Sequence, residues 1–201
     1  MKDENTQKSS AVRRSAVILT VLLAAAVVTL TALLAGAQTR LTRVKNECAD
    51  NIFSSLQIIS LNLPRYEEID EPGIIAGVPE ALMRIDTSLR LLESLSGDGK
   101  TTPDGSGFDL LATIFGGRMN SAVNGMQVKS LLSDGRLSEG EHEYLRRFNK
   151  AVDSLLSDMT DSGYSIKPGY GCEDMRGALL VFLDEWTGAG ADSSMALLSG
   201  D

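Results

Sequence analysis

The chain has 201 residues, with 19 Lys and Arg against 27 Asp and Glu, so its formal net charge is −8. This acidic balance argues against nucleic acid as a partner, because binding a phosphate backbone needs a clustered basic surface. Two cysteines and one histidine exclude a disulfide-dense scaffold and leave too few ligands for a Cys- or His-based metal site. The length fits one ordinary domain plus a membrane anchor.

An uncharged apolar run from Ala16 to Ala37 is the strongest signal in the sequence. As a helix it would be about 33 Å long, enough to cross the roughly 30 Å hydrocarbon core of a bilayer. We therefore expect an uncleaved signal-anchor over 16–37 that contacts membrane lipid. The alternative is a signal peptide cleaved after Ala37, because Ala35-Gly36-Ala37 resembles a cleavage site. The run exceeds the usual length of a signal peptide's apolar core, which favours the anchor.

The basic residues on the two sides of this helix are nearly balanced, so their count alone orients it only weakly. A short head, 1–15, precedes the helix and an acidic body follows it. Long domains cross membranes largely regardless of their charge. We therefore expect a single-pass membrane protein with a cytoplasmic head and an extracytoplasmic body.

An apolar stripe at helical spacing continues beyond the membrane run, with no proline before Pro64. The stripe consists of Leu41, Val44, Cys48, Ile52, Leu56, Ile59 and Leu63. It predicts a helical stalk over 38–63, whose stripe must be covered by later helices of the chain or by a partner. The next stretch, 64–77, is polar and rich in turn residues, which predicts a loop.

Two helices are predicted in the middle of the chain from apolar residues that recur every three or four positions. The first has Pro79 at its first position and ends at Gly97. The second starts near Phe108, and its stripe reaches Met126. Glycines inside it, such as the pair Gly116-Gly117, cost about 1 kcal/mol each relative to alanine, so a break there is the alternative.

Two further helices are predicted in the C-terminal part. Ser138 and Glu141 have the spacing of a capping box ahead of one apolar stripe, and a second stripe runs from Cys172 to Trp186. The tail, 187–201, is rich in Gly, Ala and Ser and is expected to fray.

No segment outside the membrane run has the alternating pattern of a strand. The predicted fold class is therefore all-α, with one transmembrane helix continuing into an extracytoplasmic bundle of four to five helices over 38–186. The aromatic residues at helical spacing are expected in its core. They are Phe108, Phe115, Phe148, Phe182 and Trp186.

The motifs of common enzymes are incomplete. Gly99-Lys100-Thr101 resembles the end of a P-loop, but Ser94 stands where the motif needs its first glycine, so no nucleotide site is expected. His142 lacks the second histidine of a zinc protease, because that position is Arg146. No nucleophile elbow is present either. We expect no catalysis, no cofactor and no metal.

Cys48 and Cys172 both fall on apolar stripes. If the body lies outside the cytoplasm, a disulfide between them would tie the stalk to the last helix. Closing a loop of this length would stabilise the fold by about 4–5 kcal/mol in the chain-entropy description. The alternative is two buried free thiols that pack like small apolar side chains.

A helical body after an anchor, with Gly135-Arg136-Leu137-Ser138-Glu139 opening a Leu- and Phe-striped helix, resembles the N-terminal regions of bacterial spore-germination membrane proteins. The resemblance implies a place in the bacterial envelope and assigns no role to any residue; the long C-terminal repeats of those proteins have no counterpart here. We expect a non-catalytic protein that binds a partner protein or itself through the stalk. The alternatives are a sensory module acting with a separate signalling partner, and a secreted helical protein.

Overall fold

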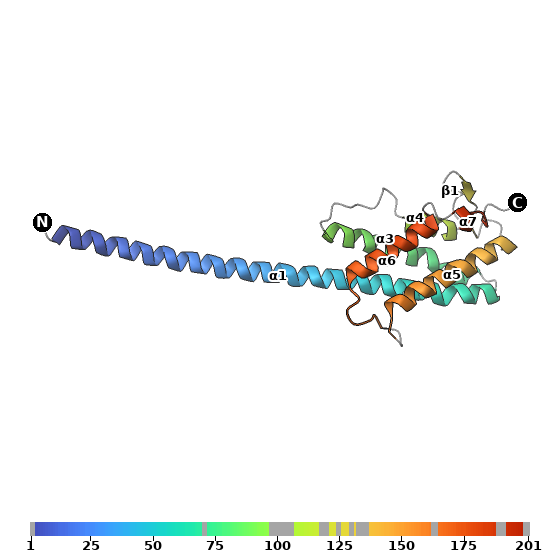
Figure 1. The fold of residues 1–201 in the computed structure, drawn as a ribbon, viewed down its shortest axis with the longest axis horizontal. Helices are drawn as coiled ribbons and strands as arrows, with labels where there is room; N and C mark the ends of the chain where they lie inside the picture. The colour runs from blue at the N-terminus through green and yellow to red at the C-terminus, as the bar shows by residue number, and fades with distance from the viewer. Residues whose placement is uncertain are drawn as a thin grey trace. The chain divides into compact units, whose positions relative to one another are not determined.

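The computed structural model describes residues 3–69, 72–96, 107–116, 121–123, 126–128, 131, 137–161, 165–187 and 192–198. The chain divides into two compact units, Met1–Val44 and Lys45–Asp201. Its elements are α1 (Asp3–Ile69), α2 (Pro72–Ile75), α3 (Gly77–Ser96), α4 (Gly107–Gly116), β1 (Ser121–Val123), β2 (Met126–Val128), α5 (Glu139–Met159), α6 (Cys172–Thr187) and α7 (Asp192–Met195) (Figure 1). The helical fold class is confirmed; a short hairpin is the exception.

The first unit contains an apolar helix long enough to cross a membrane. Its large apolar side chains from Ile18 to Leu34 are exposed, and none of its most apolar window is buried within the chain. The hydroxyl groups of Thr29 and Thr31 donate hydrogen bonds to carbonyls one turn earlier, at 2.9 and 2.8 Å. These two polar groups are therefore satisfied inside the helix, as a hydrocarbon environment requires.

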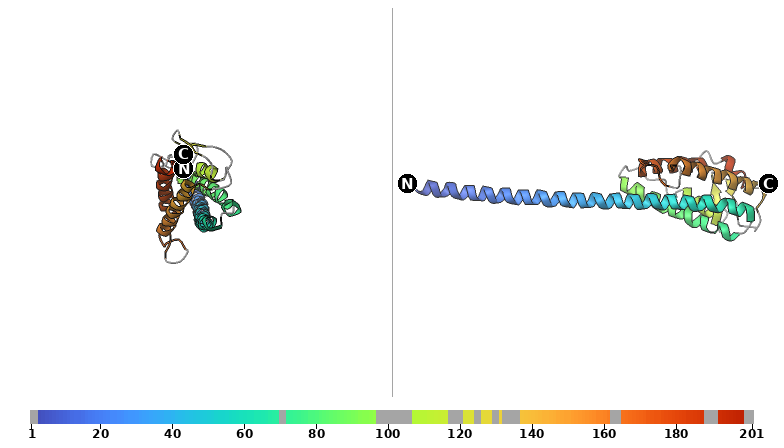
Figure 2. Two further views of the ribbon diagram at one scale, coloured as in Figure 1. Left: turned by 90° about the vertical axis from the view of Figure 1, so that its right-hand side faces the viewer. Right: turned by 90° about the horizontal axis from the view of Figure 1, so that it is seen from below.

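In the second unit, α1 is a core helix from Lys45 onward. The apolar stripe predicted for the stalk is at most 3% exposed there, at Cys48, Ile52, Leu56, Ile59 and Leu63. Figures 1 and 2 show this part of α1 alongside α3 and α5. The hydroxyl of Ser60 donates a hydrogen bond to Asp153 of α5. The chain's own helices therefore cover the stripe from Cys48 onward, whereas Leu41, its first member, is 38% exposed.

The predicted loop over 64–77 is mostly helical, which corrects the prediction. α1 continues through Pro64 to Ile69, and α2 follows after a short gap. A proline inside a helix removes one hydrogen bond and costs about 3 kcal/mol. Tyr66 and Ile75 are at most 2% exposed, so burial of large side chains on this segment offsets that cost.

The predicted helix from Phe108 to Met126 is wrong beyond Gly116, where α4 ends. β1 and β2 pair antiparallel instead, with Val123 opposite Met126. The sequence between these two residues is Asn124-Gly125, the pair most typical of two-residue hairpin turns. This signal outweighs the helical spacing, and the break at Gly116 is confirmed.

The tail also differs from expectation, since Asp192–Met195 forms α7 and both Met195 and Leu198 are at most 2% exposed. A Cβ atom placed on Gly140 of α5 would lie 2.5 Å from the carbonyl oxygen of Leu197. The described tail residues therefore pack against the first turn of α5, and the prediction of a fraying tail is corrected for 192–198.

The capping box of α5 is confirmed. The Ser138 hydroxyl accepts from the Glu141 N–H at 3.2 Å, and the Glu141 carboxylate accepts from the Ser138 N–H at 2.6 Å. The predicted aromatic core is confirmed as well, because its members are all at most 5% exposed. Phe148 is central to it, with ring centroids 4.9 Å from Trp186 and 5.0 Å from Phe115.

Candidate functional site

The connection between α5 and α6 determines where the two helices start and stop. The Lys167 ammonium donates to the carbonyls of Ser157 and Asp158 at 3.1 and 2.9 Å, which satisfies two carbonyls at the end of α5. At the start of α6, the Asp174 carboxylate accepts from the Gly171 N–H at 2.8 Å. α6 then runs back beside α5 (Figure 1).

A groove of about 630 Å³ lies between α5 and α6, and Ser194 of α7 also lines it. Its floor contains the buried side chains of Leu155, Phe182 and Trp186. Its walls contain small residues from both helices: Ala151, Ser154, Gly177 and Ala178. A Cβ on Gly177 would meet no atom within 4 Å, so the helix backbone is open to close approach there.

The rim of the groove carries one strongly exposed apolar side chain and charges of both signs. Val181 is 71% exposed, although it lines the groove. Arg147 and Lys150 lie near the middle of α5, Asp158 lies near its end, and Glu185 lies near the end of α6. Arg147 donates a hydrogen bond to Glu143 at 2.8 Å, and this contact lowers the pKa of Glu143.

Two polar atoms of the aromatic core are buried without a hydrogen-bond partner among the described residues: the Tyr144 hydroxyl and the Nε1 of Trp186, which lines the groove. The Tyr144 and Trp186 rings meet edge to face, 5.4 Å apart. Burial raises the pKa of Tyr144 far above its ordinary value, so this phenol stays protonated. It is a core residue and does not serve as a base at neutral pH.

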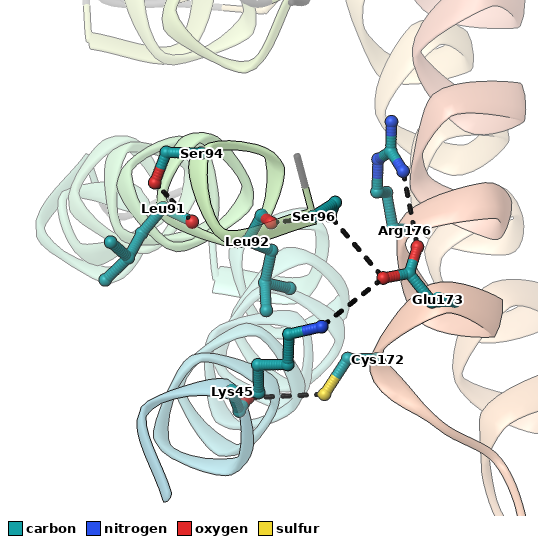
Figure 3. A network of polar contacts seen from close by, with 8 residues as sticks. All are labelled: Lys45, Leu91, Leu92, Ser94, Ser96, Cys172, Glu173 and Arg176. Carbon is teal, nitrogen blue, oxygen red and sulfur yellow. Dashed lines mark hydrogen bonds and ion pairs between the residues drawn. The ribbon is translucent and has the colours of Figure 1, made fainter. Parts of the chain in front are cut away.

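A second cluster joins α1, α3 and α6 around Glu173 (Figure 3). The Glu173 carboxylate lies 3.7 Å from the Lys45 ammonium, accepts from Arg176 at 3.2 Å and accepts from the Ser96 hydroxyl at 3.4 Å. Because Glu173 is 59% exposed, these contacts contribute little to stability. They show that the first turn of α6 lies beside the α1 turn that begins at Lys45.

Both cysteines lie at this cluster as free thiols. Cys172 is half-buried, and its Sγ donates to the Lys45 carbonyl at 3.4 Å (Figure 3). Cys48 is 3% exposed, one turn further along α1. Burial raises the pKa of both thiols, and the charge of Cys172 raises the pKa of Cys48 further. The disulfide that the sequence suggested stays a prediction.

The other singled-out residues form no chemical site among the described residues. His142 is half-buried in the first turn of α5, and its backbone N–H donates to the Ser138 carbonyl at 3.0 Å. No group of three or more metal-ligating side chains occurs within the described ranges. Gly99-Lys100-Thr101 lies outside those ranges. The groove was not predicted, because its small wall residues looked like ordinary helix positions. The small residues on both helices, together with an apolar valine at position 181, are the sequence signal from which it could have been predicted.

The comparisons with known protein families, curated proteins and solved structures find no match to this chain.

Proposed function

We propose that the protein is a non-catalytic, single-pass membrane protein of the bacterial envelope, whose extracytoplasmic bundle binds a helical segment of another protein in the α5–α6 groove. The observation that carries the proposal is the groove itself, which combines a buried aromatic floor with small walls. Small residues let a second helix backbone come close, and the apolar floor accepts its side chains.

The partner contact belongs in this groove and not on the stalk, because the α1 stripe from Cys48 to Leu63 is covered by the chain's own helices. The rim sets the chemistry of the partner. An amphipathic helix with both acidic and basic residues beside its apolar face would match a rim that carries Arg147 and Lys150 as well as Asp158 and Glu185. Its apolar face would cover Val181.

The anchor rests on the first unit. Its exposed apolar side chains need a nonpolar environment, and a bilayer provides one along the whole run. We expect the full-length chain to stay with membranes after alkaline carbonate washing. A mature N-terminus at Gln38 with the protein in the soluble fraction would instead establish cleavage after Ala37.

Site-specific photocrosslinking in intact cells tests the groove. Benzoylphenylalanine replaces Val181 in the full-length chain, and in the control it replaces Leu61, which is 67% exposed on α1 outside the groove. We expect one discrete protein adduct at position 181 and none at 61. The same adducts at both positions, or none at 181, would refute the proposal.

A matched pair of variants separates binding from folding. Gly177→Trp should fill the groove and abolish the adduct, because the open space at this position admits a large side chain without internal collision. Gly177→Ala should keep the adduct and stabilise α6 by about 1 kcal/mol. An adduct that survives Gly177→Trp would place the partner elsewhere.

A further inference from the structure

We propose that Cys48 and Cys172 form a redox site, which converts between two thiols and one disulfide that fastens the start of α6 to α1. The proposal does not depend on the proposed function. It rests on the contact between Cys172 and α1, on the different burial of the two thiols and on the ion pair beside them.

The contact places the sulfur of Cys172 on the turn of α1 that carries Cys48. Cys172 Sγ lies 3.4 Å from the carbonyl oxygen of Lys45. Helix carbonyls point toward the C-terminus, so this oxygen faces the next turn, and residues 45 and 48 share one face with Cβ atoms about 5–6 Å apart. A disulfide joins Cβ atoms about 3.5–4.5 Å apart, so bond formation requires a rotation of the Cys172 side chain and an adjustment of α6 along α1 toward Cys48.

The neighbouring residues hold this arrangement. Glu173, next to Cys172, lies 3.7 Å from the Lys45 ammonium, one turn before Cys48 (Figure 3). The first turn of α6 therefore lies against the same face of α1, and this ion pair involves neither sulfur. The charge of Cys172 raises the pKa of Cys48, which is consistent with the two thiols lying close together.

Burial sets the order of the chemistry. Cys172 is half-buried and Cys48 is 3% exposed, so an incoming disulfide meets Cys172 first. Burial raises the pKa of Cys172, and the Lys45 charge acts against that increase. Cys48 is then positioned to act as the resolving thiol, since Cys172 lies over its turn of the helix.

The oxidant is an external disulfide, either of a thiol–disulfide oxidoreductase or of a small molecule. The Cys172 thiolate attacks one sulfur of that disulfide, forms a mixed disulfide and releases the other sulfur as a thiolate. The Cys48 thiolate then attacks Cys172 Sγ, and the remaining half of the oxidant leaves as a thiolate. The two cysteines lose two electrons and two protons, and the oxidant is reduced to two thiols.

The test uses reduced full-length protein in detergent micelles, with oxidised glutathione as the probe. We expect both thiols to become unreactive to maleimide together, a Cys48–Cys172 linked peptide in the mass spectrum and a monomeric chain. The melting temperature should rise by roughly 10 °C, because the bond closes a long loop of the unfolded chain. A stable glutathione adduct on Cys172 with Cys48 still free, or intermolecular dimers alone, would overturn the proposal.

The control moves the buried thiol by one residue. Glu47 is exposed, so the double variant Cys48→Ala/Glu47→Cys carries a thiol that points away from α6. It should form the intramolecular bond at least tenfold more slowly and collect glutathione adducts instead. Equal rates in the two proteins would show that flexibility and not the native geometry brings the sulfurs together. Circular dichroism of each reduced variant verifies that the fold is retained.

Discussion

Gly140 shows how a single missing Cβ allows the tail to pack against α5. Its position leaves only 2.5 Å between the methyl carbon that alanine would add and the Leu197 carbonyl oxygen, too close for any real contact. We expect Gly140→Ala to lower the free energy of unfolding by about 1–3 kcal/mol through overpacking, despite the better helix propensity of alanine. Urea denaturation measures the change.

The same substitution should change sign when the tail is removed. In a chain that ends at Thr187 the colliding oxygen is gone, so Gly140→Ala should become neutral or stabilising. If Gly140→Ala still lowered the free energy of unfolding in the chain without the tail, the destabilisation would come from α5 itself.

Asp86 is a buried carboxylate on α3 whose charge is only partly compensated. It is 4% exposed, its Oδ2 accepts from Arg90 at 2.8 Å, and its Oδ1 has no hydrogen-bond partner among the described residues. Burial raises the pKa of Asp86, against the lowering effect of Arg90. A raised folded pKa means that protonation favours the folded state, so this residue's contribution to stability falls as pH rises through the folded pKa.

Asp86→Asn should therefore raise the free energy of unfolding at neutral pH, and the gain should vanish in acid where Asp86 itself is protonated. Urea denaturation across this pH range gives the measurement. Glu143→Gln is the matched control, because Arg147 lowers the pKa of Glu143 and its removal should have the opposite sign at neutral pH. If Asp86→Asn instead lowered the free energy of unfolding at neutral pH, the Arg90 contact would outweigh the cost of burying the Asp86 charge.

Among the elements, α5 and α6 were predictable because their signals are local. The capping box at Ser138 needs only residues within one turn, and stripes such as Leu145 to Met159 directly mark the buried face. The α1 stripe was predictable for the same reason, although the sequence could not decide between the chain and a partner as its cover. The structure assigns that cover to the chain's own helices.

The hairpin was misassigned because a local turn signal was overlooked, whereas the segment after Pro64 and the tail were misassigned because distant contacts override local preference. Pro64 signals a helix end, yet Leu63 and Tyr66 are buried on either side of it and α1 continues. Met195 and Leu198 lie in a tail whose composition suggests disorder, but both are buried. The groove could not be predicted from spacing, because it depends on which sides of α5 and α6 stay uncovered.

The N-cap residue Ser138 stabilises the first turn of α5. Ser138→Ala removes the acceptor for the Glu141 N–H and should cost about 1 kcal/mol, whereas Ser138→Asp keeps an acceptor and should cost much less. Thermal denaturation followed by circular dichroism compares the two. Equal losses for both variants would show that the cap hydrogen bond does not account for the effect.

At the scale of the whole molecule, every buried hydrophobic residue among those described lies between Cys48 and Leu198. The second unit, Lys45–Asp201, therefore contains the core, and residues 18–44 of the first unit contribute no buried hydrophobic side chain to it. This division falls a few residues after the predicted end of the membrane run, since residues beyond Ala37 are polar enough to leave a bilayer but are not yet covered by other helices.

A chain that starts at Lys45 should consequently fold alone. We expect it to stay in solution without detergent, with a helical circular dichroism spectrum and a melting temperature close to that of the full-length protein. Sedimentation and thermal denaturation of both chains provide the comparison. Aggregation of the shorter chain would mean that residues before Lys45 take part in the fold of the body.

The position of the two sulfurs gives a way to determine which side of the membrane the body occupies. Disulfides persist in the periplasm and outside the cell but are rare in the reducing cytosol. Rapid acid trapping of living cells, followed by a count of alkylated thiols, would show whether Cys48 and Cys172 are bonded, and a disulfide would place the body outside the cytosol. The protein thus carries its own topology reporter, with no fusion needed to read it.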